Sequence, residues 1–127
     1  MIAITAASYS GNKGAAAMLQ SSISQLFNIY GSRLNINLMS TYPQEDRELV
    51  KHDFINVISC KPENLVFLIF PLALIYRALR FVAPIRYLIE RNTVIRAYKN
   101  SDLVLDEAGV SFIDSRGIIM NLYAFIT

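Results

Sequence analysis

The chain has 127 residues, of which 54% are hydrophobic and 17% charged, and its formal net charge at pH 7 is +2. This length can bury the core of one domain but cannot build two lobes, and the small net charge gives no electrostatic support for nucleic-acid binding. The single cysteine, Cys60, excludes an internal disulfide, and the single histidine, His52, argues against a histidine-based metal site.

The N-terminal part of the chain predicts a strand, a turn and a helix. Residues 1–7, "MIAITAA", are an apolar run that predicts a buried strand, and serines with Gly11 predict a turn after it. From Gly14 to Tyr30 apolar residues recur at helical spacing, and Gly31 follows in the position of a helix C-cap. This order is that of a Rossmann-type unit.

The remaining elements alternate in the same way. We expect strands at residues 34–39, 54–59 and 103–106, a short helical turn at 45–50, helical segments at 65–89 and 94–98, and a helix over 118–126. The longest helical pattern should bend or break at Pro71 and Pro84. Mostly apolar strands that alternate with helices predict an α/β, Rossmann-like fold, with a mostly parallel sheet in the order 3-2-1-4 and helices on both faces.

The loop "SGNKGAAA" after the first strand is the first candidate site. Gly11 and Gly14 let the backbone approach a ligand, Lys13 adds a positive charge, and Asn12 tolerates a left-handed turn or donates hydrogen bonds. The sequence matches neither the dinucleotide fingerprint G-x-G-x-x-G nor the phosphate loop G-x-x-x-x-G-K-[ST]. The spacing alone therefore fits a ligand loop and an ordinary turn equally well.

A second candidate site follows the last predicted strand, in "DLVLDEAGVSFIDSRG". The residues that crowd this short loop are Asp106, Glu107, Gly109, Asp114 and Arg116. Ligands of open α/β sheets bind at the carboxyl ends of strands, and in the 3-2-1-4 order this loop shares an edge with the first loop. The alternative is a solvated loop with a turn contact between Asp114 and Arg116.

Together, the N-x-G loop that opens an Ala-rich helix and the later segment resemble the polysaccharide pyruvyl transferase family. Asn12 and Gly14 fall on the family's N-x-G loop, and Asp102, Gly109 and Asp114 fall on its "D…GG…D" segment. The match covers essentially the whole chain, as the family's N-terminal part.

The chain departs from the family pattern at two positions. The acidic residue that often follows the first loop's glycine is Ala15 here, and the paired glycine is Ala108–Gly109. The resemblance implies that residues 1–127 are the N-terminal, Rossmann-like lobe of an enzyme with two lobes similar to the GT-B glycosyltransferases, with the C-terminal lobe absent.

Members of this family transfer the enolpyruvyl portion of phosphoenolpyruvate to two sugar hydroxyls, which gives a pyruvate ketal and phosphate. The resemblance implies a cytoplasmic enzyme with phosphoenolpyruvate as donor substrate, no further cofactor, and a sugar or lipid-linked glycan as acceptor. The substrate-binding candidates are Asn12, Lys13, Gly14, Gly109, Asp114 and Arg116. No catalytic residue or metal ligand is assigned, because the family's residues for phosphoenolpyruvate lie mainly in the C-terminal lobe, and His52 does not inherit their role.

Two other functions remain open. The chain also fits the acceptor lobe of a GT-B glycosyltransferase that uses a nucleotide sugar, and a non-catalytic α/β module that binds a glycan or a membrane. An acidic ribose-binding loop in a second lobe would favour the glycosyltransferase, whereas arginine and histidine in its strand-end loops would favour pyruvyl transfer.

The apolar segment from Leu65 to Ile89 is the last feature that the fold class does not explain. Its uninterrupted apolar run, residues 65–76, is too short to span a bilayer, and the arginines of the segment, with Arg91 just beyond, alternate with aromatic residues. One interpretation, which we favour, is a long helix that packs on the sheet and against the second lobe. The other is an amphipathic segment in contact with the inner face of the membrane.

Overall fold

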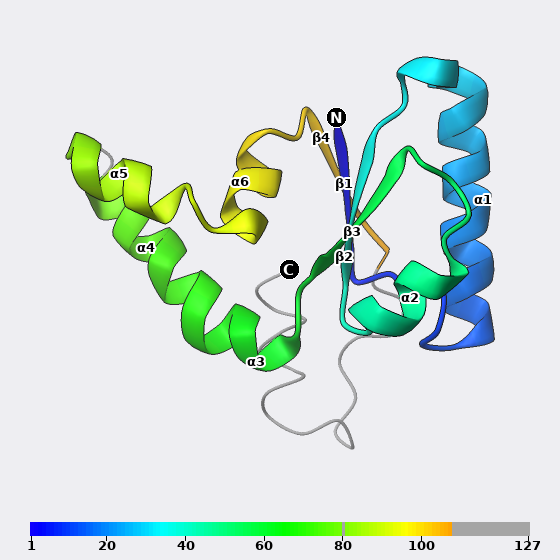
Figure 1. Cartoon of the computed structure of the whole chain (residues 1–127), viewed down its shortest axis with the longest axis horizontal. Coiled ribbons are helices and arrows are strands. Elements are labelled where there is room, and N and C mark those ends of the chain that lie inside the picture. The colour runs from blue at the N-terminus through cyan, green and yellow to red at the C-terminus, as the bar shows by residue number, and fades with distance from the viewer. Residues whose placement is uncertain (80, 108–127) are drawn as a thin grey trace.

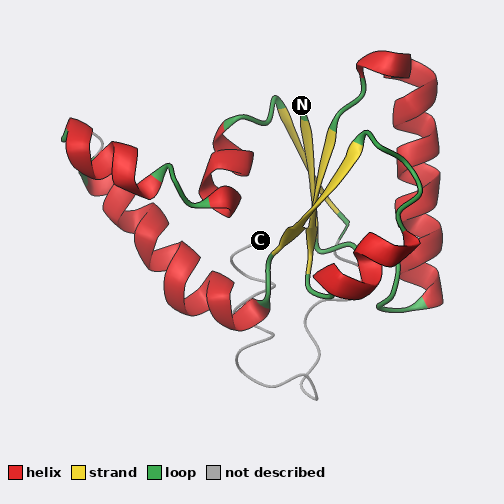
Figure 2. Ribbon diagram, in the orientation of Figure 1, coloured by secondary structure: helices red, strands yellow, loops and turns green. Residues whose placement is uncertain are grey.

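The computed structural model describes residues 1–79 and 81–107, in which four parallel strands form one sheet in the order β3-β2-β1-β4. The predicted order and the parallel pairing are therefore confirmed. The helices cover both faces of the sheet, as Figures 1 and 2 show. The helix predicted over 118–126 lies outside the described residues.

The elements follow the predicted alternation closely. In chain order they are β1 (Ile2–Thr5), α1 (Lys13–Tyr30), the 3₁₀-helix η1 (Gly31–Arg33), β2 (Ile36–Ser40), α2 (Pro43–Leu49), β3 (Ile55–Ser59), α3 (Pro62–Asn64), the π-helix η2 (Leu65–Ile69), α4 (Phe70–Ala78), α5 (Ala83–Ile89), α6 (Thr93–Lys99) and β4 (Leu103–Asp106). Gly31 ends α1 with a φ of 56°, a conformation that glycine adopts without steric cost, so the predicted C-cap is confirmed.

Two layers of core hold the helices to the sheet because side chains alternate along each strand. On one face Ile2 and Ile4 of β1 pack with Leu19 and Ile23 of α1. On the other face Ala3 belongs to a second cluster, which includes Met39, Cys60, Leu65, Val94 and Ala97. This second cluster is smaller, and among the described residues it is the cluster that attaches α6 and the segment beginning at Leu65 to the sheet.

The segment from Leu65 to Ile89 differs from the long helix that the sequence predicts. The helix passes through Pro71 without a break, because the preceding π-helix widens the backbone and the proline then falls in the first turn of α4. The break instead lies between α4 and α5, and Pro84 occupies the first turn of α5, where its missing N–H costs nothing.

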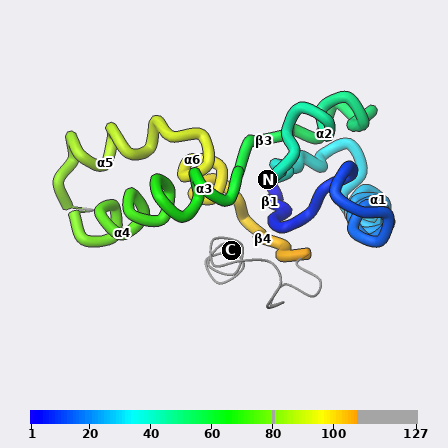
Figure 3. Tube along the Cα trace, turned by 90° about the horizontal axis from the view of Figure 1, so that it is seen from below, coloured from blue at the N-terminus to red at the C-terminus, as the bar shows by residue number. Residues whose placement is uncertain are grey.

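We term residues 65–79 and 81–89 the arm. Both of its ends are buried, Leu65 at 2% exposure in the second core cluster and Ile89 at 5%, but α4 contains no buried residue. Figure 1 shows α4 leading away from the sheet and α5 leading back toward α6, and Figure 3 shows the two helices side by side. The expected packing on the sheet is therefore right only for the first residues of the arm, where Leu65 joins the second core cluster. Among the described residues, no helix has the length and apolar character needed to cross a bilayer.

Candidate functional site

The carboxyl edge of the sheet at β1 and β4 is the candidate site. The chain runs from β1 outward to β2 and β3 and then returns to place β4 on the other side of β1. Open α/β sheets bind ligands at such a point, where the strand order reverses. The strands end level with each other, since Thr5 pairs with Asp106 and the Glu107 N–H donates to the Thr5 carbonyl at 3.1 Å.

The loop between β1 and α1 is folded around the Ser8 hydroxyl. Its oxygen accepts hydrogen bonds from the backbone N–H groups of Ser10 at 3.1 Å and Gly11 at 3.0 Å. The chain enters this loop through Ala6, whose φ of 55° lies in the left-handed region that a residue with a Cβ seldom adopts. Strain of this kind persists where the surrounding structure holds the backbone in place, and it is common at binding sites.

Asp46 of α2 is the group that holds this loop to the sheet. Its carboxylate is completely buried, and Oδ1 accepts from the Ser8 hydroxyl at 3.1 Å, the Ser10 N–H at 2.9 Å and the Ser10 hydroxyl at 2.7 Å. The other oxygen, Oδ2, accepts from the Ser40 hydroxyl at the end of β2 at 2.6 Å. A buried carboxylate is stable when several donors surround it. One side chain therefore joins the loop, the end of β2 and α2.

Sequence reasoning predicted a short helical turn at 45–50, where α2 lies, but missed this cluster. The signal was present, since Pro43, Asp46 and Val50 recur at helical spacing, which places Asp46 on the face of α2 that meets the core. An aspartate at a core-facing position needs buried donors, and serines at strand ends supply them.

Two acidic side chains flank Tyr9 at the same edge. Burial raises the pKa of Tyr9, and the negative charges of Asp46 and Glu107 raise it further. Within the part of the chain that the structure describes, both carboxylate oxygens of Glu107 and the hydroxyl of Thr5 are buried without a hydrogen-bond partner. Buried polar groups without a partner are costly, and in native proteins such groups commonly have a functional role or bind a water or an ion.

The predicted site residues Asn12, Lys13 and Gly14 form the start of α1 beside this edge. Asn12 is the N-cap, and its Oδ1 accepts from the Ala15 N–H at 2.7 Å. A Cβ on Gly14 would meet that Oδ1 at 3.3 Å, so the glycine makes room for the cap. Lys13 is exposed. Asn12 therefore orients the free N–H groups of the helix start, and its own oxygen is already engaged.

The other predicted site residues, Gly109, Asp114 and Arg116, lie outside the described residues. The structure does establish that β4 ends beside β1, on the edge that carries the first loop. The expectation that the two loops share a site remains a prediction.

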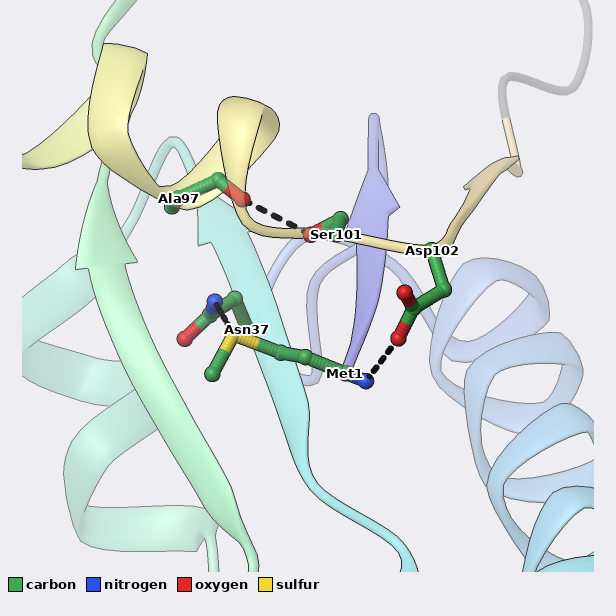
Figure 4. A network of polar contacts seen from close by, with 5 residues as sticks. All are labelled: Met1, Asn37, Ala97, Ser101 and Asp102. Atoms are coloured by element: carbon green, nitrogen blue, oxygen red, sulfur yellow. Dashed lines mark hydrogen bonds and ion pairs between the residues drawn. The ribbon is translucent and has the colours of Figure 1, made fainter.

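Asp102, which falls on the family segment in the resemblance, lies at the opposite edge of the sheet. It precedes β4, and its carboxylate contacts the Met1 ammonium at 2.7 Å (Figure 4). Nearby, Asn37 donates to the Met1 sulfur at 2.9 Å, and the Ser101 hydroxyl donates to the Ala97 carbonyl at 2.7 Å. The ion pair at Asp102 lowers the pKa of its carboxyl group. Its role in this structure is to join the amino ends of β1 and β4.

A groove extends the candidate site along the carboxyl ends of β2 and β3. Its volume is about 620 Å³, and it is lined by Thr41, Tyr42, Pro43, Gln44, Glu45, Arg47, Ser59, Lys61, Pro62 and Glu63. The Tyr42 ring is half exposed there, beside charged groups of both signs. An aromatic ring with charged donors and acceptors can bind a polar ring such as a sugar.

His52 and Cys60 take no part in the site. His52 precedes β3 at the other edge and stacks on Phe54, with ring centroids 5.0 Å apart. Cys60 is buried, and burial raises the pKa of its thiol to about 11. Within residues 1–79 and 81–107, the structure brings together no cluster of three or more histidine, cysteine, aspartate or glutamate residues that suits a metal ion.

Comparisons with known proteins find no significant match for this chain among protein families, curated proteins or solved structures.

Proposed function

We propose that the chain is the N-terminal lobe of a polysaccharide pyruvyl transferase, with an overall fold similar to that of the GT-B glycosyltransferases. In this proposal it forms one wall of a cleft and binds the sugar acceptor, which belongs to a cell-surface polysaccharide or its lipid-linked precursor. The observation that carries the proposal is that the loop leading to Asn12–Gly14 leaves β1 at the edge of the sheet where β4 also ends, at the point where the strand order reverses.

The acceptor side of the cleft has the chemistry that a sugar needs. Sugar hydroxyls donate hydrogen bonds, and the carboxylate of Glu107 with the hydroxyl of Thr5 supplies acceptors that have no partner among the described residues. The start of α1 adds free N–H groups. Phosphoenolpyruvate, by contrast, needs several cationic groups, and Lys13 is the cation in the Asn12–Gly14 loop. In this proposal the second lobe therefore binds the donor. The enzyme acts at the cytoplasmic side of the membrane.

Ligand titration followed by amide NMR tests the proposal. We expect hexoses and N-acetylhexosamines to shift the signals of Ser10, Gly11 and Glu107, and phosphoenolpyruvate to leave them unchanged. Glu107→Gln should weaken sugar binding, whereas Glu48→Gln, at an exposed position of α2, should not. Shifts with a nucleotide sugar alone would favour the glycosyltransferase alternative. No shift with any of these ligands would contradict a sugar site.

The isolated chain should not turn over phosphoenolpyruvate. A cleft enzyme needs both walls to align donor and acceptor, and much of its rate acceleration comes from that alignment. A coupled phosphate assay with phosphoenolpyruvate and a glycan acceptor measures this, with an intact family member as positive control. Phosphate release by the 127-residue chain would contradict the one-lobe proposal.

A further inference from the structure

The arm carries a large exposed apolar surface away from the sheet. Phe81 is 83% exposed and Tyr87 is 72% exposed. The other large apolar side chains of the arm that are exposed are Phe67, Leu68, Phe70, Leu74, Ile75, Leu79, Val82 and Leu88. Apolar patches of this extent on a protein surface mark a site that binds another apolar surface.

The charge of the arm restricts what that surface binds. From Leu65 to Ile89 the sequence contains three arginines, Arg77, Arg80 and Arg86, and no aspartate or glutamate. Two copies that met arm to arm would therefore place like charges together without any carboxylate to pair them. An apolar surface rimmed by negative charge is complementary to the arm, and a bilayer that contains anionic lipids provides one.

A cavity at the turn of the arm provides a place for a phosphate group. Its volume is about 400 Å³, and it is lined by Tyr76, Arg77, Phe81 and Arg86. Guanidinium groups bind phosphate oxygens with two parallel hydrogen bonds, and aromatic rings favour the boundary between lipid and water. This combination fits a lipid headgroup better than it fits an uncharged apolar partner.

Glu90, just beyond the arm, holds a residue of the cavity lining in place without cancelling the positive charge of the cavity's arginines. Its Oε1 accepts from the Tyr76 hydroxyl at 2.8 Å and contacts Lys99 Nζ at 2.6 Å, whereas Arg86 Nε lies farther away, at 3.9 Å. Lys99 therefore pairs with the negative charge of Glu90, and the Tyr76 hydroxyl links the last turn of α4 to the residue that follows α5.

We propose that the arm is a membrane-binding element that lies on an anionic lipid surface, with its exposed apolar side chains in the interface and the cavity of Arg77 and Arg86 around a lipid phosphate. This interaction surface does not depend on pyruvyl transfer. Binding of sugars without binding of vesicles would contradict only this proposal. Binding of vesicles without binding of sugars would contradict only the proposed activity.

Vesicle flotation of the full chain gives the first test. We expect binding to vesicles of phosphatidylcholine with phosphatidylglycerol, weaker binding at high salt, and little binding to phosphatidylcholine alone. Replacing Arg77 and Arg86 by glutamine should weaken binding roughly fivefold for each arginine, about 25-fold for both. The matched control is Arg33→Gln, at an exposed position of η1 outside the arm, which should bind as the parent chain does.

Tryptophan fluorescence separates lipid contact from association between proteins. The chain contains no tryptophan, so Phe81→Trp introduces a single probe in the arm, and Ile29→Trp places one at a 72% exposed position of α1. We expect brominated lipids to quench the probe at position 81 and not the probe at position 29. Vesicle binding that does not change with lipid charge or salt would overturn the proposal. Concentration-dependent self-association without quenching at position 81 would also overturn it. Both probe positions are exposed, and circular dichroism checks that each variant is folded.

Discussion

At the scale of single residues, Asp46 determines the shape of the candidate site. It links the loop after β1 to the end of β2 through four hydrogen bonds, and the bonds to Ser8 and Ser10 span 38 and 36 residues of sequence. A contact between residues so far apart is not encoded in any local pattern. The loop could be predicted from its glycines and Asn12, and helical spacing could place Asp46 on the core face of its helix, but the donors that Asp46 meets depend on the fold.

Asp46→Ala should destabilise the protein by about 3 kcal/mol or more, because it leaves buried donors on Ser8, Ser10 and Ser40 without an acceptor. Asp46→Asn should cost less, since it retains one carbonyl oxygen. Urea unfolding measures the difference, and Glu48→Ala, at an exposed position of the same helix, should change stability by less than about 0.5 kcal/mol. Equal effects of Asp46→Ala and Glu48→Ala would show that the cluster is not stabilising.

Cys60 should be unreactive in the folded protein. Burial raises the pKa of its thiol from its ordinary value near 9.0 to about 11, so the reactive thiolate is scarce at pH 8. Because the folded pKa is the higher one, the stability linked to this group is fully present below pH 9 and is lost as the pH rises toward 11. A thiol-specific disulfide reagent should therefore label Cys60 at pH 8 only after denaturant is added. Rapid labelling of the native chain would contradict the buried position.

At the scale of elements, local patterns predict some features well and others not. The strands are recognisable because they are short apolar runs between turn residues, and their order follows from right-handed connections. The π-helix before Pro71 was missed, because the sequence marks only where the proline removes an N–H donor. How the backbone accommodates that loss depends on Leu65, which the second core cluster fixes in place.

The structural role of Asn12 as the cap of α1 can be tested separately from a role in binding. Asn12→Ala should cost about 1 kcal/mol because it removes the acceptor for the Ala15 N–H. Asn12→Asp keeps that acceptor and adds negative charge near the positive end of the helix dipole, so it should be at least as stable as the parent chain. Thermal unfolding measures both, and Asn28→Ala in the same helix, where the side chain is exposed, should be neutral or slightly stabilising. If Asn12→Ala has no effect on the melting temperature, the cap is not formed in solution.

At the scale of the whole molecule, the sheet and the arm are stabilised to different degrees. β1 and β2 are buried along their full length, whereas α4 contains no buried residue and the arm joins the core through Leu65. The composition predicted a surplus of apolar residues but not their location. That location depends on the turn between α4 and α5, which leads the chain back toward α6 and β4.

Hydrogen exchange should resolve this difference. Amides of the arm should exchange through local openings that cost only about 0–3 kcal/mol, because few buried contacts are lost when the arm opens. Amides of β1 and β2 should need openings close to global unfolding, about 5 kcal/mol or more. Mass spectrometry of peptides from residues 66–79 and from β2 compares the two in one sample, and α1 serves as an internal reference because Leu19, Ile23 and Leu26 are buried. Arm peptides protected as strongly as those of β2 would mean that the arm packs against another surface in solution, and the exposed apolar surface on which the membrane proposal rests would then be absent.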